Sequence, residues 1–423
     1  MDAAPVPVPG PRPAALVFIF ITVALDILAI GIIIPVLPHL VADFLGGDLV
    51  SAATTVGWFS TLFALMQFLF SPLLGALSDR FGRRPVILLS NLGLGLDYVF
   101  MALAQTLPLL VIGRLISGIT SASISTAGAY IADVTPPEKR AAGFGLLGAA
   151  FGLGFVIGPA LGGLLAGSDP RLPFWVAAAL SLTNFCYGFF VLPESLPKDK
   201  RAALVLKRAN PVGSLLLLKR YPQVFGLAGV VLLSNLAHIV LPATFVLYAD
   251  YRFGWDAWDV GLCLAVVGVC SALVQGGLVR RVVARIGEFR ALLTGLTMGA
   301  IGFAAYGYAP DGRWFFAAIP LMALWGLAGP AAQGMMTRQV DPAEQGRLQG
   351  ALTSLTGLVG IFGPQVFAQT FAWFISPAAP FVLPGAAFHL AAVCLAFALL
   401  LAWRVGRVHR PTGEAPAATA PAD

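Results

Sequence analysis

Residues 75–85 read Gly75-Ala-Leu-Ser-Asp79-Arg80-Phe-Gly82-Arg83-Arg84-Pro85 and lie between two long apolar runs. The glycines permit close helix approach and a tight turn. Asp79 can accept hydrogen bonds from a helix N-terminus or pair with Arg83. The motif, here called the gate motif, therefore predicts a turn between two helices whose charges hold one conformation of a two-state protein. The simpler alternative is that its arginines only anchor topology.

The apolar runs beside this motif recur along most of the chain. Of its 423 residues, 58% are hydrophobic and 11% are charged, whereas a soluble domain carries roughly 25% charged residues. Most of the outer face must therefore meet lipid, where helices and closed barrels satisfy the backbone. The runs extend over about twenty residues rather than the ten or so alternating residues of a barrel strand. The composition thus predicts an all-α membrane protein.

The hydrophobic pattern predicts twelve transmembrane helices in two bundles of six. The first six cover 14–36, 53–77, 85–104, 108–132, 141–166 and 173–192, and the second six cover 223–249, 258–279, 290–309, 314–337, 347–373 and 380–403. The resulting division is an N-terminal tail 1–13, a bundle 14–192, a linker 193–222, a bundle 223–404 and a disordered tail 405–423. The first run has no clear small-residue cleavage site, so we expect a retained helix.

The basic residues predict the orientation in the membrane. Of 26 Lys and Arg residues, one lies inside a span (Arg114) and three lie in odd-numbered loops (Arg171, Arg252 and Arg313). The remaining 22 lie at the termini or in even-numbered loops. Because cytoplasmic loops carry the excess of Lys and Arg, both termini are expected in the cytoplasm. The net charge of +6 then reflects topology, and we expect no nucleic-acid partner.

An internal repeat supports two pseudo-symmetric bundles. Residues 80–83 (Arg-Phe-Gly-Arg) and 285–288 (Arg-Ile-Gly-Glu) are 205 positions apart, and Gly158-Pro159 and Gly363-Pro364 share that offset. Transporters made of two such halves bind their substrate at the interface near the middle of the membrane.

Glycines recur along the fifth span at Gly154, Gly158, Gly162 and Gly163, with a kinking proline at Pro159. Such a face allows a neighbouring helix to approach closely. Packing alone is an open alternative to a functional role.

These motifs resemble those of a known family. Residues 75–85 resemble the signature of the major facilitator superfamily, and Gly113-Arg114-Leu-Ile-Ser117-Gly118 resembles its buried-arginine motif. The fifth span resembles the motif of exporters that exchange drug for protons. Further segments resemble the bacterial tetracycline efflux proteins: Leu25-Asp26, Gly31-Ile-Ile-Ile-Pro35-Val-Leu-Pro38, Ala64-Leu-Met-Gln67, Leu96-Asp97-Tyr98, Tyr130-Ile-Ala-Asp133 and Arg252-Phe-Gly-Trp255. The resemblance implies a monomeric drug/proton antiporter of the bacterial inner membrane.

Ionisable residues within the membrane are costly and usually functional. We expect Asp26, Asp97 and Arg114 to couple proton movement to transport, with Arg114 near Asp26. Asp133, at the end of the fourth span, is expected to complete the gate motif by contacting Arg140 or the linker. The alternative for Asp26 is a structural pair with Arg114 without proton traffic, and the alternative for Asp97 is hydrogen bonding to neighbouring helices.

Substrate contacts are expected from Gln67, Arg114, Gln275 and Gln333, because amides in an apolar cavity suit a planar, oxygen-rich ligand. The second bundle departs from the tetracycline efflux pattern. Where those proteins carry an acidic residue in helix nine and a histidine in helix eight, this chain has Gly299 and Ser271. His238 is a candidate substitute, since histidine titrates near neutral pH.

Two functions therefore remain open: a tetracycline/proton antiporter, or a porter for another drug, a sugar or an organic anion. The expected partners are the substrate, protons and the lipid bilayer. The chain has no metal-ligand spacing, nucleophile elbow or phosphate loop, so we expect neither an enzyme nor a bound metal or cofactor.

Overall fold

The computed structural model describes residues 13–121, 123–136, 140–201, 221–341 and 344–408. Within these ranges, twelve helical segments are long and apolar enough to cross a membrane. The prediction of an all-α membrane protein with twelve spans in two bundles is confirmed.

The N-terminal bundle forms six spans from eight helices. They are α1 (Pro13–Ile33), α2 (Leu37–Phe44), α3 (Leu49–Phe81), α4 (Arg83–Leu103), α5 (Leu107–Thr120), α6 (Ser123–Val134), α7 (Arg140–Ala166) and α8 (Leu172–Phe190). The short 3-10 helix η2 (Lys198–Lys200) follows them. The first span is interrupted next to Pro35, whose ring prevents a regular helical hydrogen bond. α1 and α2 therefore share one span, as do α5 and α6.

The C-terminal bundle contains more interrupted spans. Its helices are α10 (Pro222–His238), α11 (Val240–Phe253), α12 (Ala257–Leu273), the π-helix η5 (Val274–Leu278), α13 (Val279–Ile286), α14 (Glu288–Tyr308), α15 (Gly312–Ala323), the 3-10 helix η6 (Leu324–Leu327), α16 (Ala328–Thr337), α17 (Gln345–Ile375) and α18 (Ala386–Val408). Span seven is thus interrupted between α10 and α11, span eight contains the π-helix η5, and span ten contains the 3-10 helix η6.

Local chemistry explains where several helices begin. Asp48 caps α3 by accepting from the backbone N–H of Val50 at 3.0 Å. The Ser51 hydroxyl also donates to Asp48 and holds the pKa of that carboxyl below its usual range. Gly82 and Gly287, 205 positions apart, precede α4 and α14 with φ of 111° and 78°. These backbone angles favour glycine, which explains why both repeats place glycine at this turn.

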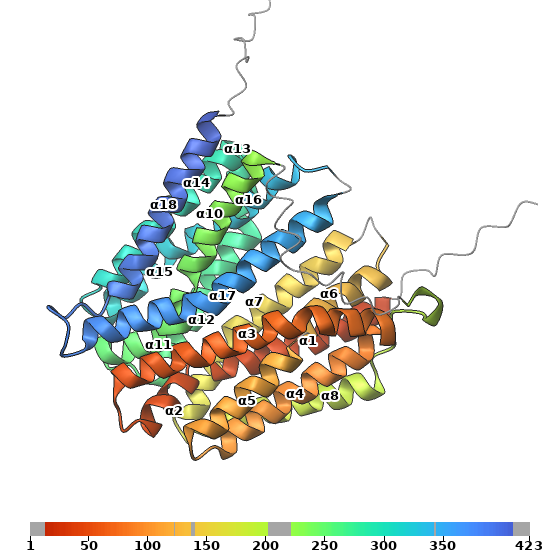
Figure 1. Cartoon of the computed structure of the whole chain (residues 1–423), viewed down its shortest axis with the longest axis horizontal. Helices are drawn as coiled ribbons and strands as arrows, with labels where there is room; N and C mark the ends of the chain where they lie inside the picture. Colours follow the sequence, from red (N-terminus) through yellow and green to blue (C-terminus); the bar gives the residue numbers. More distant parts are fainter. Residues whose placement is uncertain (1–12, 122, 137–139, 202–220, 342–343, 409–423) are drawn as a thin grey trace, which may run out of the picture.

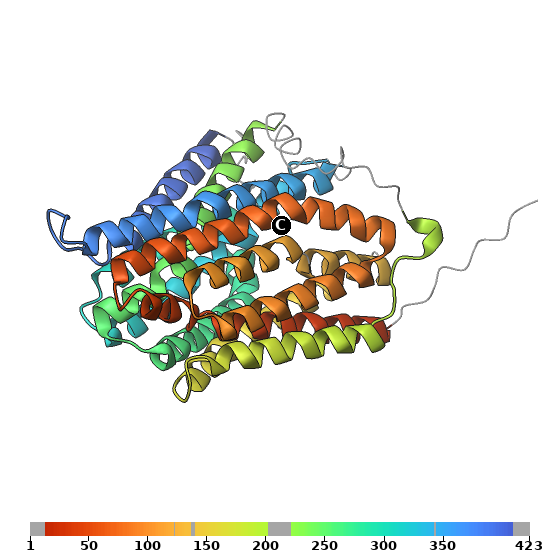
Figure 2. The ribbon, with the colours of Figure 1, turned by 60° about the horizontal axis from the view of Figure 1, so that its bottom comes forward.

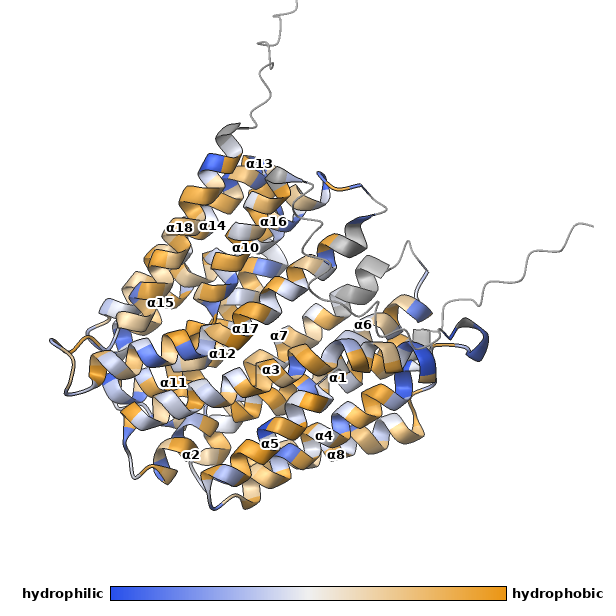
Figure 3. Ribbon diagram, viewed as in Figure 1, coloured by the Kyte–Doolittle hydropathy of each residue, from blue (hydrophilic) through white to orange (hydrophobic). Residues whose placement is uncertain are grey.

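The two bundles meet at one side of the molecule and diverge toward the other (Figure 1). We call the side that holds the start of α1, the end of α18 and the turns at Gly82 and Gly287 the terminal side. The opposite side holds the turns around Gly46, Gly254 and Asp311. Figure 3 shows hydrophobic residues along the helices and hydrophilic residues gathered at the helix ends, notably at η2 and α13 on the terminal side.

Contacts between the bundles lie toward the opposite side. α3 runs alongside α17 (Figure 2), α7 packs on α12, and α2 lies against α11. The Thr61 hydroxyl donates to the carbonyl oxygen of Ile361 at 2.9 Å. On the terminal half of α7, by contrast, side-chain carbons built at Gly145, Gly148 and Gly152 would meet nothing within 4 Å. This state is therefore closed at the opposite side and open toward the terminal side.

Several predicted boundaries differ from the structure. The first span extends to Phe44 rather than to 36, the second covers Leu49–Phe81 rather than 53–77, and the eighth extends to Ile286 rather than to 279. The last span begins at Ala386 rather than at 380, because Pro380 and Pro384 disfavour a helix interior there. α18 then continues to Val408, so residues 405–408 are helical and not part of a disordered tail. Residues 1–12, 202–220 and 409–423, which hold most of both tails and of the linker, lie outside the described residues.

Candidate functional site

Arg83 is the centre of the gate motif on the terminal side. Its guanidinium forms an ion pair with Asp79 one turn earlier, donates to the Ser78 hydroxyl at 2.7 Å, and donates from Nε to Asp133 at 3.0 Å. The Arg83 side chain is only 12% exposed, and its hydrogen bonds to these two carboxylates offset the cost of burying its charge. The motif therefore ties the turn after α3 to the end of α6.

Glu194 is a member of this cluster that the sequence did not indicate. It follows α8, and its carboxylate accepts from the backbone N–H of Arg83 at 2.9 Å and of Arg84 at 3.3 Å. A negative charge at a helix N-terminus satisfies free N–H groups and stabilises the helix. A side chain at Gly82 would collide with this carboxylate. Gly82 is therefore required both by its φ angle and by the space that Glu194 fills.

The segment after α8 is held at two further points. Ser195 donates to Asp133 at 3.1 Å, and Tyr130 donates to the carbonyl oxygen of Pro193 at 3.0 Å. Asp133 thus contacts the start of the linker, as expected, whereas the Arg140 side chain lies outside the described residues. Arg80 lies over the ring of Phe81 at 5.3 Å, and Gly75 faces open space. Among the described residues, no hydrogen bond or ion pair joins Arg80 to the other bundle, and a side-chain carbon at Gly75 would meet no atom within 4 Å.

The C-terminal bundle has its own ion pair at the equivalent turn. Arg338, after α16, forms a bidentate ion pair with Glu288 at the start of α14. Tyr221, just before α10, donates to Glu344 at 2.6 Å. The far end of the linker is therefore attached to this bundle.

Asp97 and Arg114 form a buried ion pair within the N-terminal bundle. Arg114 Nη2 on α5 lies 2.7 Å from Asp97 Oδ2 on α4, and Asp97 is fully buried. Arg114 also lies over the ring of Phe63 at 5.8 Å, and its side chain is 16% exposed. The pair thus has one member enclosed between helices and one member that reaches the space between the bundles.

Asp26 accepts hydrogen bonds from two asparagine side chains. Asn184 on α8 donates to Asp26 Oδ1 at 2.9 Å and to the carbonyl oxygen of Thr22 at 2.8 Å. In the orientation that satisfies both atoms of its amide, Asn91 on α4 donates to the two Asp26 oxygens at 3.1 and 3.0 Å. The ion pair of Arg114 is made with Asp97, and the expectation that Arg114 also lies near Asp26 stays a prediction.

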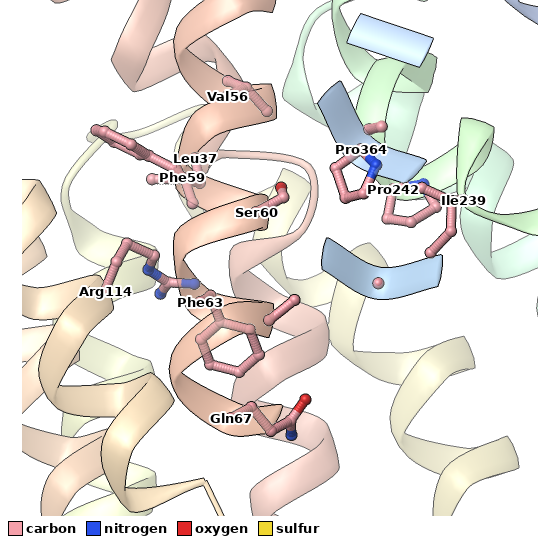
Figure 4. A pocket seen from close by; sticks show the side chains of 13 residues that line it. Leu37, Val56, Phe59, Ser60, Phe63, Gln67, Arg114, Ile239, Pro242 and Pro364 are labelled. Atoms are coloured by element: carbon pink, nitrogen blue, oxygen red, sulfur yellow. The ribbon is translucent and has the colours of Figure 1, made fainter. Parts of the chain in front are cut away.

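A cavity of about 320 Å³ lies between the bundles (Figure 4). On the N-terminal side Arg114, Phe63 and Gln67 face it, and on the C-terminal side Pro242 and Pro364 do so. Gln67 donates to the Ser121 hydroxyl at 3.0 Å. The cavity offers one cation and one amide in an apolar wall, the composition typical of a small-molecule site.

A larger cavity of about 560 Å³ lies within the C-terminal bundle. Three lining residues lie where spans seven, eight and ten are interrupted: His238 at the end of α10, Gln275 in η5 and Trp325 in η6. Asn235 and Ser271 add polar groups, and the ring centroids of His238 and Trp325 are 5.7 Å apart. Interrupted helices at a cavity are typical of transporter binding sites.

Two positions singled out in the sequence are absent from both cavity walls. Gln333 on α16 lines neither cavity, and its described hydrogen bond is that of its carbonyl oxygen with Thr337. A side-chain carbon at Gly299 would lie 2.8 Å from the indole of Trp325 and 2.7 Å from Leu395. The space that an acidic side chain would need in helix nine is therefore filled by Trp325.

The glycines of α7 pack against helices of both bundles. A side-chain carbon at Gly158 would lie 2.7 Å from the Cα of Gly31, and Gly154 and Gly162 also face α1. Gly163 instead contacts the backbone of Ala257 and Trp258 at the start of α12, and the Pro159 carbonyl oxygen approaches Gly261. α7 is therefore held closely between a helix of its own bundle and a helix of the other.

A profile of the Major Facilitator Superfamily matches residues 19–364 of the chain. The chain belongs to the Major Facilitator Superfamily.

Curated relatives in this superfamily cover most of the chain. The class C tetracycline resistance protein of Escherichia coli is 42% identical over 351 residues, which are 83% of this chain and 88% of that protein. The class B protein of Escherichia coli is 39% identical over 350 residues, 81% of this chain and 85% of that protein. Multidrug resistance protein 2 of Bacillus subtilis (strain 168) is 29% identical over 347 residues, 80% of this chain and 84% of that protein.

Solved structures of the superfamily share the fold. The human organic anion transporter MFSD10 (TETRAN) superposes with a TM-score of 0.69 at 25% identity, over 93% of this chain and 99% of that chain. A bacterial homolog of the human lysosomal transporter Spinster gives a TM-score of 0.76 at 16% identity, over 95% of this chain and 98% of that chain. The chain is thus a multi-pass membrane protein with a superfamily transporter fold.

Proposed function

We propose that this chain exports tetracycline, or a drug of its type, across the bacterial inner membrane in exchange for protons. The observation that carries the proposal is the 42% identity to a tetracycline resistance protein over 83% of the chain. The charged and polar residues between and beside the bundles are consistent with that function.

The distribution of basic residues supports a cytoplasmic location of the terminal side, and hence of both termini. The gate arginines and η2 lie there, as do Arg280, Arg281 and Arg285 of α13. With this orientation the described state is open to the cytoplasm, ready to take up a drug. The chain then acts as two bundles, 14–192 and 223–404, joined by the linker 193–222.

The drug is proposed to bind between the two bundles. Arg114 and Gln67 would bind its oxygen atoms from one side, and Gln275 from the larger cavity on the other. His238 and Trp325 provide flat rings against which a planar molecule can stack. Gln333, which lines neither cavity, is assigned no direct contact.

Proton coupling is assigned to Asp97, Arg114 and Asp26. The ion pair with Arg114 stabilises ionised Asp97, so a proton that binds Asp97 removes the charge that holds the arginine. Proton binding and the paired, drug-ready arrangement therefore oppose each other, as antiport requires. Asp26 accepts from two asparagine amides in an enclosed site, and a proton there would change the packing of α1 on α4 and α8.

The gate motif and the glycines of α7 support the change between states. When the terminal side closes, Gly75 and Arg80 are available for contact with the other bundle, since Gly75 faces open space and Arg80 has no ion pair among the described residues. Gly163 and Pro159 form the contact with α12 that must loosen when the opposite side opens. In this proposal the chain acts as a monomeric transporter and not as an enzyme.

A second candidate function is a porter for another drug or a small metabolite. One observation favours it: the larger cavity is lined by His238, Asn235, Ser271 and Gln275 and by no carboxylate among the described residues. A site with this lining suits a neutral or anionic ligand better than a cationic one.

Expression in a tetracycline-sensitive bacterium tests the proposal. The chain should raise tetracycline tolerance and lower intracellular drug, and liposomes should show drug-induced proton flux. Asp97→Asn should abolish the flux while the protein still reaches the membrane. Unchanged tolerance and unchanged accumulation with a well-expressed chain would favour the second candidate function, and a panel of sugars and organic anions would follow.

A further inference from the structure

Two residues on the opposite side link the bundles. His39 lies on α2 of the N-terminal bundle, and its Nδ1 is 3.7 Å from Oδ2 of Asp250 on α11 of the C-terminal bundle. Their side chains are 22% and 34% exposed. The ion pairs of Arg83, Arg114 and Arg338, by contrast, each lie within one bundle. The contact between His39 and Asp250 must therefore break when this side opens.

The other ring nitrogen of His39 has no acceptor. Nε2 is buried without a hydrogen-bond partner among the described residues. A neutral imidazole protonated on Nδ1 fits this site, because Nε2 then carries no hydrogen. A second proton would create a charged N–H that is enclosed and unpaired, so it would carry the full cost of removing that group from water.

Nearby charges act in the other direction. Asp250 on α11, Asp43 on α2 and Asp256 at the start of α12 all attract a protonated His39. Asp48 at the start of α3 is engaged by Ser51 and by the N–H of Val50, and Arg252 on α11 donates to the carbonyl oxygen of Ala309. A partly exposed pair such as His39 and Asp250 is weakened by solvent. The burial of the ring therefore outweighs the attraction from these carboxylates.

We propose that His39 is a proton-binding residue of the contact between the bundles on the opposite side, and that its protonation opens that side. Opening moves the ring away from Asp250 and lets water reach Nε2, so the charged form is stable only in the open state. Acid outside the cell would then favour the state that releases drug and takes up protons. The inference rests on the proposed antiport only for the advantage to drug release, because the acid-induced opening itself needs no drug.

Spin labels on the two bundles report the opening directly. Ser168→Cys lies in an exposed turn of the N-terminal bundle and Ala378→Cys in a turn of the C-terminal bundle; the four native cysteines are replaced. Distances are measured on the full chain in lipid nanodiscs at pH 8 and pH 5.5, without drug. The ratio of open to closed molecules should rise about tenfold at pH 5.5, as expected for one coupled proton.

Variants separate His39 from other groups. His39→Gln should remain closed at both pH values, whereas Asp250→Asn should keep or enlarge the acid response, because it removes only the attraction that opposes opening. His389→Gln is the matched control, since His389 contacts the ring of Tyr308 within one bundle, and it should respond like the parent chain.

The proposal is overturned if His39→Gln still opens in acid, if Asp250→Asn loses the response, or if acid shortens the distance. Failure of tetracycline export in cells would leave these distances unaffected, so the two proposals fail separately.

Discussion

Glu288 occupies in the C-terminal bundle the position that Arg83 occupies in the N-terminal bundle, with the opposite charge. Each residue directly follows a glycine of positive φ and begins a helix, and the two are 205 positions apart. Their partners, Asp133 and Arg338, are separated by the same offset. The duplicated unit thus keeps an ion pair between the same two turns while exchanging the signs of its members.

The two pairs should differ in their effect on stability. Arg338 is 66% exposed and Arg83 is 12% exposed with three side-chain acceptors. Arg338→Gln should therefore cost less than about 1 kcal/mol, and Arg83→Gln about 2 kcal/mol or more. Thermal unfolding of the purified protein measures both. Equal losses of stability in the two variants would contradict a larger contribution from the more buried Arg83.

Glu194 should matter for both stability and transport. Glu194→Gln keeps the size of the side chain but removes the charge at the start of α4, so we expect a loss of about 1 kcal/mol and slower transport. Ser195→Ala, which removes one hydrogen bond to Asp133, is the milder control. If Glu194→Gln unfolds at the same temperature as the parent chain, the cap is not needed.

Asp97 and Arg114 should behave as a unit. Asp97→Asn leaves a cation without its partner, and removing one member of a buried pair costs about 3–5 kcal/mol. Asp97→Asn combined with Arg114→Gln should cost less than the sum of the single changes, because no unpaired charge remains. A double-mutant cycle by thermal unfolding gives the coupling energy. Additive losses would show that the two residues are independent.

Adjacent glycines of α7 should fail in different ways. Gly162→Ala forces α7 away from α1 inside one bundle and should lower the yield of folded protein. Gly163→Ala disturbs the contact with α12 of the other bundle and should weaken closure of the opposite side in a protein that still folds. Gly152→Ala, on the same helix facing open space, is the matched control. Expression yield and the label distances described above distinguish the three.

Glutamine changes should separate cavity contacts from structural roles. Gln275→Leu removes an amide from the larger cavity and should raise the KM for tetracycline about tenfold, the effect of losing one hydrogen bond of about 1.4 kcal/mol. Gln333 lies outside both cavities, so Gln333→Leu should change the KM for tetracycline less than about twofold. Drug uptake into everted vesicles measures both values, and the reverse order would move the binding site to α16.

Hydropathy and charge predicted the arrangement of spans, because each span is an independent run of apolar residues. The gate pair of Asp79 and Arg83 was also predictable, since the two residues lie four positions apart across the short turn at Gly82. Contacts between distant segments were not. Glu194 reaches a turn 111 positions earlier, and the sequence carried no sign of this beyond an acidic residue after the sixth span.

The partner of Arg114 and the role of Gln333 depend on how each helix is rotated about its axis. Asp26 and Asp97 are both mid-span carboxylates, and hydropathy does not say which of them faces α5. The 3-10 turn η6 has about three residues per turn, so it changes the face on which Gln333 of α16 projects. Polar residues in apolar spans, such as Asn91 and Asn184, were the available signal for the Asp26 site.

The close packing of α7 restricts how natural relatives of this chain can vary. At Gly158 and Gly163 the neighbouring atoms belong to the main chain of another helix, and a main chain cannot be shortened by a compensating mutation. Leu153, Phe155 and Ile157 of the same helix are exposed toward the surroundings of the bundle, where many apolar side chains serve equally well. Divergent homologues should therefore differ freely along one stripe of this helix and hardly at all along the other two.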